Sequence, residues 1–249
     1  MATFEHPPEP DAQAGWRVAR AACAHAGTVF GDRLVSVYAI GSLAHGGFAS
    51  AVSDVDVAVF VDRCDERLPA AIATVVQSTR TQLDPGLADR LSIFYGDWPS
   101  FAAPPQSARL YPIDRLDVME HGLLMLGADL RAQHGVRPTR AELEAQTASL
   151  LAALLAQRRS TDELIAGGTR VLTRAVLLPI RCLYTQATGR AGANHDAVRW
   201  YRDHRGQHLA LAEAALSWRS GAIDTRAARL LLERQLEGLY DESRRALGI

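Results

Sequence analysis

The stretch Val35–Val61, VSVYAIGSLAHGGFASAVSDVDVAVFV, decides the fold. Its first part is apolar and β-branched, which predicts a buried strand over Leu34–Ile40. A glycine turn follows, and the chain then returns as a second predicted strand over Asp54–Val61. The stretch therefore predicts two neighbouring strands joined by a short turn that begins with Gly41.

Two carboxylates, Asp54 and Asp56, open the second predicted strand. Alternate residues of a strand point to one face, so these side chains lie side by side while the valines between them face a core. Like charges held together repel, and a cation between them removes the repulsion. The pair therefore predicts a divalent metal site, with solvated acids on an edge strand as the alternative.

Gly41 and Ser42 follow the first predicted strand directly. Glycine lets the backbone turn sharply and approach a ligand closely. The serine hydroxyl and the amides after it are suitable donors for a phosphate oxygen. Ser53 is predicted to be the turn residue that leads into the second strand.

The rest of the first half predicts helices and one more strand around this pair. Residues 14–31 and 68–83 have helical periodicity, and Arg90–Tyr95 has the pattern of a third strand. Residues 97–112 predict an irregular loop, and 114–130 a short helix followed by a strand or turn. The acids Asp114, Asp117 and Glu120 are interpreted as a solvated helix face, with an acidic wall for a cationic ligand as the alternative.

From Pro138 onward the pattern is helical throughout. We predict an α+β protein with a flexible leader over 1–13, a mixed-sheet domain with flanking helices over 14–135, and an all-α helical bundle over 136–249. The predicted helices of the bundle are residues 139–159, 161–188, 196–204, 207–219 and 225–247.

Composition excludes several classes of protein. The 249 residues carry a net charge of −1, which gives no electrostatic argument for nucleic acid or an anionic membrane. The three cysteines (Cys23, Cys64 and Cys182) are far apart and predict neither a disulfide framework nor a zinc site. The chain shows no signal peptide and no long apolar run, so we expect a cytoplasmic protein.

The order of Gly41-Ser42, a spacer and Asp54-Val55-Asp56 resembles the signature of the DNA polymerase β-like nucleotidyltransferase superfamily. The runs LYTQATGRAGANHDAVRW (183–200) and ALSWRSGAID (215–224) resemble the helical domain of the streptomycin/spectinomycin adenylyltransferases. The resemblance covers about residues 30–225. It implies a nucleotidyltransferase domain followed by a helical domain.

This resemblance implies a Mg²⁺-dependent transfer of AMP, or another NMP, from ATP or another NTP to a hydroxyl of a small molecule. It implies that Asp54 and Asp56 bind Mg²⁺, and that the Gly41-Ser42 turn, with Ser53, holds the nucleotide. Arg90 is a candidate for holding the triphosphate. The acceptor would bind in the cleft between the domains. An aminoglycoside-like acceptor, and with it a role in antibiotic resistance, is one candidate.

The same resemblance implies a third carboxylate on the next strand, but Arg90–Tyr95 contains none. Asp89 and Asp97 flank that strand and are the candidates, with Glu120 a more distant one. The absence of an acid there supports an alternative function: a nucleotide-binding sensor or antitoxin-like protein of the same fold, with little or no transfer activity.

Overall fold

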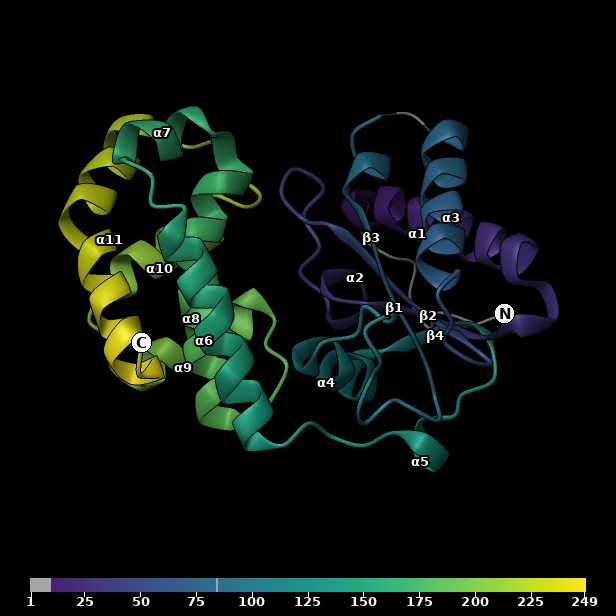
Figure 1. Cartoon of the computed structure of the whole chain (residues 1–249). Helices are drawn as coiled ribbons and strands as arrows, with labels where there is room; N and C mark the ends of the chain where they lie inside the picture. Colours follow the sequence, from purple (N-terminus) through teal and green to yellow (C-terminus); the bar gives the residue numbers. More distant parts are fainter. Residues whose placement is uncertain (1–9, 84) are drawn as a thin grey trace. The chain divides into compact units, whose positions relative to one another are not determined.

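A computed structural model describes residues 10–83 and 85–249 (Figure 1). The chain folds into two compact units that divide between Pro138 and Thr139. The predicted leader over 1–13 is wrong in part, because residues 10–13 form the first turn of helix α1 (Pro10–Phe30). Residues 1–9 lie outside the described residues.

The first unit is built on a four-stranded mixed sheet with the strand order β3-β2-β1-β4. Strand β1 pairs antiparallel with β2 and with β4, whereas β2 pairs parallel with β3. Strand β2 therefore lies inside the sheet, and the interpretation of Asp54 and Asp56 as acids on an edge strand is wrong. The strands are β1 (Leu34–Ile40), β2 (Val55–Val61), β3 (Leu91–Asp97) and β4 (Leu123–Gly127).

Helices cover both faces of this sheet (Figure 1). The valines of β2 pack with apolar residues of α1 and α3 on one face. On the opposite face Ala58 and Phe60 pack with Trp98, Phe101 and Val118, the last of these from α4. The further helices of this unit are α2 (Ser42–His45), α3 (Leu68–Gln82), α4 (Pro112–His121) and α5 (Arg131–His134), with 3-10 turns η1 (Gly31–Arg33) and η2 (Ala88–Arg90).

The second unit is helical, and the long helix α8 contacts five other helices of it. Leu172, Val176 and Ile180 of α8 are almost fully buried in its core. This confirms the predicted α+β class with an all-helical second part. The helices are α6 (Arg140–Ala156), α7 (Thr161–Ala166), α8 (Gly168–Thr188), α9 (Asn194–Asp203), α10 (Leu209–Ser217) and α11 (Thr225–Leu247).

The predicted single helix over 161–188 is wrong. It breaks at Gly167, and Gly168 has a φ of +78°, a backbone conformation outside a right-handed helix. Ser160 caps the short helix α7 through a reciprocal pair of hydrogen bonds with Glu163, which fixes where that helix begins.

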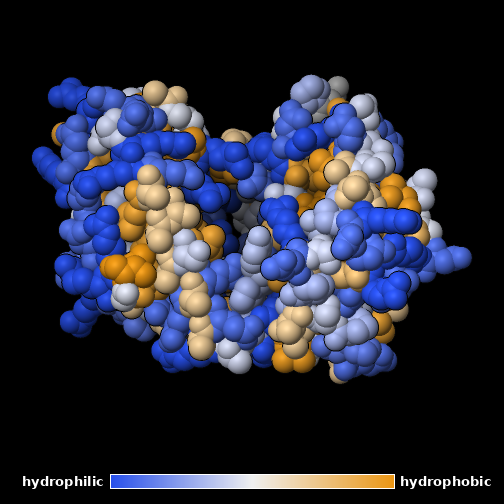
Figure 2. All heavy atoms as spheres, viewed as in Figure 1, coloured by the Kyte–Doolittle hydropathy of each residue, from blue (hydrophilic) through white to orange (hydrophobic). Residues whose placement is uncertain are grey.

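The face seen in Figure 2 is mostly hydrophilic, with apolar atoms in scattered patches. Among the described residues, none of the helices is both long and apolar enough to cross a bilayer.

Candidate functional site

The Gly41 turn brings the end of β1 against the second carboxylate of β2. Gly41 has φ +65° and ψ −151°, a region of backbone space that is essentially restricted to glycine. A Cβ atom at Gly41 would lie 2.5 Å from Oδ2 of Asp56, so a side chain at this position would occupy the place of that carboxylate. The glycine is therefore needed both for the turn and for the close approach of Asp56.

The structure brings both predicted metal ligands to this corner. Asp54 directly precedes β2, and Asp56 is its second residue, opposite Ile40 of β1 and Ser92 of β3. Both aspartates are partly exposed, as a ligand-binding carboxylate must be. Ser42, also partly exposed, is the first residue of α2 and follows Gly41 directly. The Gly-Ser turn and the Asp-x-Asp pair therefore lie at the same corner of the sheet.

Arg90 fixes the loop that leads into this site. Its guanidinium donates to the carbonyl oxygen of Ser53 over 2.8 Å and also to that of Ser50. The hydroxyl of Ser53 accepts the amide of Ala49 at 3.0 Å, which closes the loop from inside. Arg90 thus holds the backbone just before Asp54, while its predicted contact with a nucleotide, like that of Ser53, stays a prediction.

The structure does not bring Asp89 and Asp97 to this corner. Asp89 lies in η2 and forms a 3.8 Å ion pair with Arg80 of α3, the helix on the face opposite to Asp56. Asp97 pairs in register with Val61, whereas Asp56 pairs with Ser92. Five strand residues, about 16 Å, therefore separate Asp97 from the level of Asp56.

Asp97 instead has a structural role. Its carboxylate accepts hydrogen bonds from the amides of Cys64 and Ser100, each at 2.7 Å, and from the Ser100 hydroxyl at 2.5 Å. Burial would raise the pKa of Asp97, but these donors outweigh it and hold that pKa below its usual value. Burial, and then the hydrogen bond with Asp97, raise the pKa of Cys64 to about 12.

Strand β3 supplies no acid at the site. Leu91 and Ile93 belong to the core with α1 and α3, while Phe94 packs on the opposite face. Ser92 therefore shares a face with Asp56, beside which it lies in the parallel register. At the level of Asp56, strand β3 therefore presents an uncharged hydroxyl and no carboxylate.

Helix α4 carries an acid that the sequence did not single out for the site. Asp117 is 9% exposed, and its Oδ2 accepts the backbone amide of Gly41 at 2.7 Å. Glu120, on the same helix, has an 8% exposed side chain and is paired with Arg137. The interpretation of Asp114, Asp117 and Glu120 as a solvated helix face is therefore wrong. Burial, with a smaller effect of the Asp117 charge, also raises the pKa of Asp114 to about 7.

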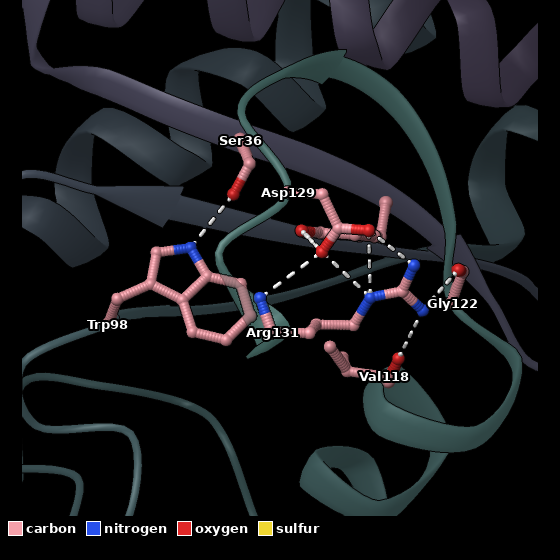
Figure 3. Close-up of polar contacts among 7 residues, drawn as sticks. Ser36, Trp98, Val118, Gly122, Asp129 and Arg131 are labelled. Atoms are coloured by element: carbon pink, nitrogen blue, oxygen red, sulfur yellow. Dashed lines mark hydrogen bonds and ion pairs between the residues drawn. The ribbon is translucent and has the colours of Figure 1, made fainter. Parts of the chain in front are cut away.

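A cluster of hydrogen bonds fixes the carboxyl end of α4 (Figure 3). The guanidinium of Arg131 donates to the carbonyl oxygens of Val118 and Gly122, over 3.3 and 2.8 Å. The same guanidinium binds the carboxylate of Asp129, which also accepts the Tyr38 hydroxyl at 3.0 Å. The hydrogen bonds from Arg131 are the main reason that the pKa of Asp129 falls to about 2.

The residues present are compatible with Mg²⁺. Over residues 10–83 and 85–249, no three His, Cys, Asp or Glu side chains form a complete ligand set. Mg²⁺ does not require such a set, because it commonly takes one or two carboxylates and fills its other positions with water and substrate phosphates. Asp54 and Asp56 would supply the hard oxygen ligands that this arrangement needs.

The second unit contains a separate pocket of about 210 Å³. Four arginines line it together with Tyr240, and none of the predicted site residues belongs to it. One of the four, Arg158, is already paired with Glu237 at 2.7 Å. All four are exposed to solvent.

Comparison with known proteins identifies the fold. No model of a protein family matches the chain, and no curated protein matches it either. Among solved structures, the spectinomycin adenyltransferase AAD(9) from Enterococcus faecialis, crystallised with ATP and spectinomycin, matches with a TM-score of 0.68. The match has 11% sequence identity and covers 94% of this chain and 99% of the other. The chain therefore has the fold of that adenyltransferase over nearly its whole length.

Proposed function

We propose that this protein is a Mg²⁺-dependent nucleotidyltransferase that moves AMP, or another NMP, from an NTP to a hydroxyl of a small molecule. One observation carries the proposal: the Gly41-Ser42 turn lies directly against Asp56, with Asp54 at the start of the same strand. The fold shared with an adenyltransferase crystallised with ATP supports it.

Each residue of the site has a chemical role in this reaction. Asp54 and Asp56 would hold Mg²⁺, which when bound neutralises charge on the phosphate oxygens. Ser42 and the backbone of the Gly41 turn would orient the phosphates. The arrangement favours catalysis by positioning and electrostatic stabilisation, the main contributions in phosphoryl transfer.

The reaction balances as a displacement at phosphorus. The oxygen of the acceptor hydroxyl forms a bond to the α-phosphorus, and the bond from that phosphorus to the bridging oxygen breaks. Pyrophosphate leaves with the bonding electron pair, and the hydroxyl proton passes to a base or to water. Spectinomycin is the first acceptor to test, because the matching adenyltransferase was crystallised with it.

The test is direct detection of the product. The protein is incubated with Mg²⁺, each of the four NTPs and a panel of aminoglycosides that includes spectinomycin, and mass spectrometry searches for an acceptor heavier by one nucleotidyl group. The Asp54→Asn/Asp56→Asn variant should form no product. The matched control is Asp32→Asn, which alters an exposed carboxylate in η1 and should transfer at the wild-type rate.

A second candidate function has one observation in its favour. Ser92, which carries no charge, lies beside Asp56 on β3. A site with fewer acids suits a protein that binds a nucleotide without transferring it. Equilibrium binding of ATP by the wild type, lost in the double variant, together with no product for any acceptor, would favour this function over the transferase.

A further inference from the structure

The pocket of the second unit has a lining that carries charge of one sign only. Its walls come from the end of α6, from α7, from the first turns of α8 and from α11. Four of the ten described residues that line it are arginines, and none of the ten is an acid. A hollow surrounded by positive charge concentrates its field and attracts anions. The lining therefore points to a negatively charged ligand.

The charges of Arg159 and Arg174 are available to such a ligand. Arg158 is neutralised in part by Glu237, which lies 2.7 Å away. Neither Arg159 nor Arg174 forms an ion pair or donates a side-chain hydrogen bond to any part of the chain that the structure describes. Arg159 has only the longer-range attraction of Glu163, whose carboxylate already caps α7. A guanidinium without a protein partner can donate two parallel hydrogen bonds to an anion.

Tyr240 adds a neutral donor to the same pocket. Its side chain is 6% exposed and belongs to the core of the second unit, yet its hydroxyl forms no hydrogen bond with the described residues. This hydroxyl is not one of the fully enclosed polar atoms of those residues, so a ligand can reach it. Burial, and then the charge of Glu237, raise the pKa of Tyr240 to about 12. The hydroxyl therefore keeps its proton at neutral pH and can donate it to an anion in a hydrogen bond.

The other lining residues and the size of the pocket limit the ligand further. Leu164 and Ala175, both buried, form an apolar part of the lining with Leu154 and Val171. The volume of about 210 Å³ is below the range of about 300–1,000 Å³ that is usual for drug-sized ligands, so the pocket suits a small molecule. Several arginine donors and one hydroxyl need several acceptor atoms on one group. A phosphate ester provides three such oxygens, and its carbon part can contact the apolar residues.

We propose that this pocket binds a small organic phosphate. Arg159, Arg174 and the hydroxyl of Tyr240 hold the phosphate, and the apolar residues contact the carbon part of the ligand. The proposal does not depend on nucleotidyl transfer, because it concerns binding to residues of the second unit alone. It names a chemical class that includes two sources: an acceptor that carries a phosphate, and an effector that is not itself modified.

The test uses phenyl phosphate as the probe, with the full chain in isothermal titration calorimetry. The buffer contains EDTA and 0.15 M salt and no nucleotide, so that neither a metal site nor weak long-range attraction contributes. We expect phenyl phosphate to bind at least about tenfold more tightly than phenol, which lacks the phosphate, because charge-assisted hydrogen bonds are lost. It should also bind more tightly than methyl phosphate, which lacks a large apolar part.

Two substitutions assign this binding to the pocket. Arg174→Gln should weaken the binding of phenyl phosphate by about tenfold, and Tyr240→Phe by about three- to tenfold. Neither side chain loses a hydrogen bond within the protein, so the unfolding temperature of both variants should equal that of the wild type or exceed it. The matched control is Arg234→Gln, which removes an exposed arginine of α11 outside the pocket. It should bind phenyl phosphate within about twofold of the wild type.

The proposal is wrong if phenyl phosphate does not bind, if phenol binds equally well, or if Arg174→Gln and Arg234→Gln bind alike. A second measurement distinguishes the two sources of the ligand. Glycerol phosphate, which has free hydroxyl groups, is incubated with the protein, Mg²⁺ and each NTP. If it gains a nucleotidyl group in the wild type and less in Arg174→Gln, the pocket holds the acceptor. If it binds through Arg174 but stays unmodified, the pocket holds an effector.

Discussion

Replacement of Gly41 by alanine tests the geometry on which the site depends. The new Cβ atom would lie 2.5 Å from Oδ2 of Asp56 and 3.2 Å from its Cβ and Cγ atoms. Real Cβ atoms do not approach other atoms so closely, so the Asp56 side chain or the strand must move. Alanine would also have to adopt φ +65° and ψ −151°, which costs about 1–3 kcal/mol for a residue with a side chain.

The two effects together should lower the free energy of unfolding of the first unit by about 2–4 kcal/mol. That is a large fraction of the stability of an ordinary domain, about 5–15 kcal/mol. The variant should therefore remain folded in buffer but unfold at a clearly lower urea concentration. Because Asp56 is displaced, nucleotidyl transfer should fall with it.

The control for this substitution is Gly31→Ala. Gly31 also has a positive φ, +52°, but a Cβ atom there would have no other atom within 4 Å. Gly31→Ala should therefore lower the free energy of unfolding only through the left-handed backbone conformation, by about 1–2 kcal/mol. Urea unfolding followed by tryptophan fluorescence compares the two variants with the wild type. If Gly41→Ala is no less stable than Gly31→Ala, Asp56 does not lie against the turn and the geometry of the site is wrong.

Three further predictions follow from other contacts. Arg90→Gln should lower the free energy of unfolding by about 1–2 kcal/mol in urea, because the loop before Asp54 loses charged donors to two carbonyl oxygens; an unchanged midpoint would contradict this role. Asp97→Asn should destabilise the first unit by about 2 kcal/mol in the same assay, and a wild-type value would show that its hydrogen bonds are not formed. The pKa of Asp129 in the folded protein, about 2, lies below its ordinary value of 3.8. The stability that this carboxylate contributes is therefore present above about pH 4 and is lost as the pH falls toward 2. Since this carboxylate is 39% exposed, we expect it to contribute about 1 kcal/mol to the free energy of unfolding after solvent screening. Asp129→Asn should therefore remove the loss of stability between about pH 4 and 2 in an acid-unfolding curve. An unaltered curve would refute the lowered pKa.

The elements around Gly41 are predictable from sequence because their signals are local. The β-branched runs of β1 and β2 are bounded by glycine and serine, so strand β1 is found with its observed ends and β2 differs by one residue at Asp54. The spacing of Gly41, Ser42 and the aspartate pair also lies in one stretch, which is why these residues are brought together as predicted.

The parts of the site that were missed depend on contacts between distant segments. That Ser92 lies beside Asp56 follows from the parallel register of β2 and β3, which no local pattern determines. Asp117 lies between two apolar residues of α4. Its burial could not be predicted, because it depends on the packing of α4 against the sheet face that carries Phe60 and Trp98. The break before α8, in contrast, has a local cause in the sequence, the pair Gly167-Gly168. The helical pattern of apolar residues on both sides of this pair nevertheless predicts one continuous helix.

Helix α4 is tied to strand β1 at two points, and this explains how a buried acid is held beside the turn. Asp117 binds the amide of Gly41, directly after the last residue of β1. At its carboxyl end the helix is held by Arg131, whose partner Asp129 accepts the hydroxyl of Tyr38 in the middle of the same strand. Strand β1 and helix α4 are therefore connected by hydrogen bonds at two places. A substitution at Arg131 should weaken the second of these connections and reduce stability and transfer together.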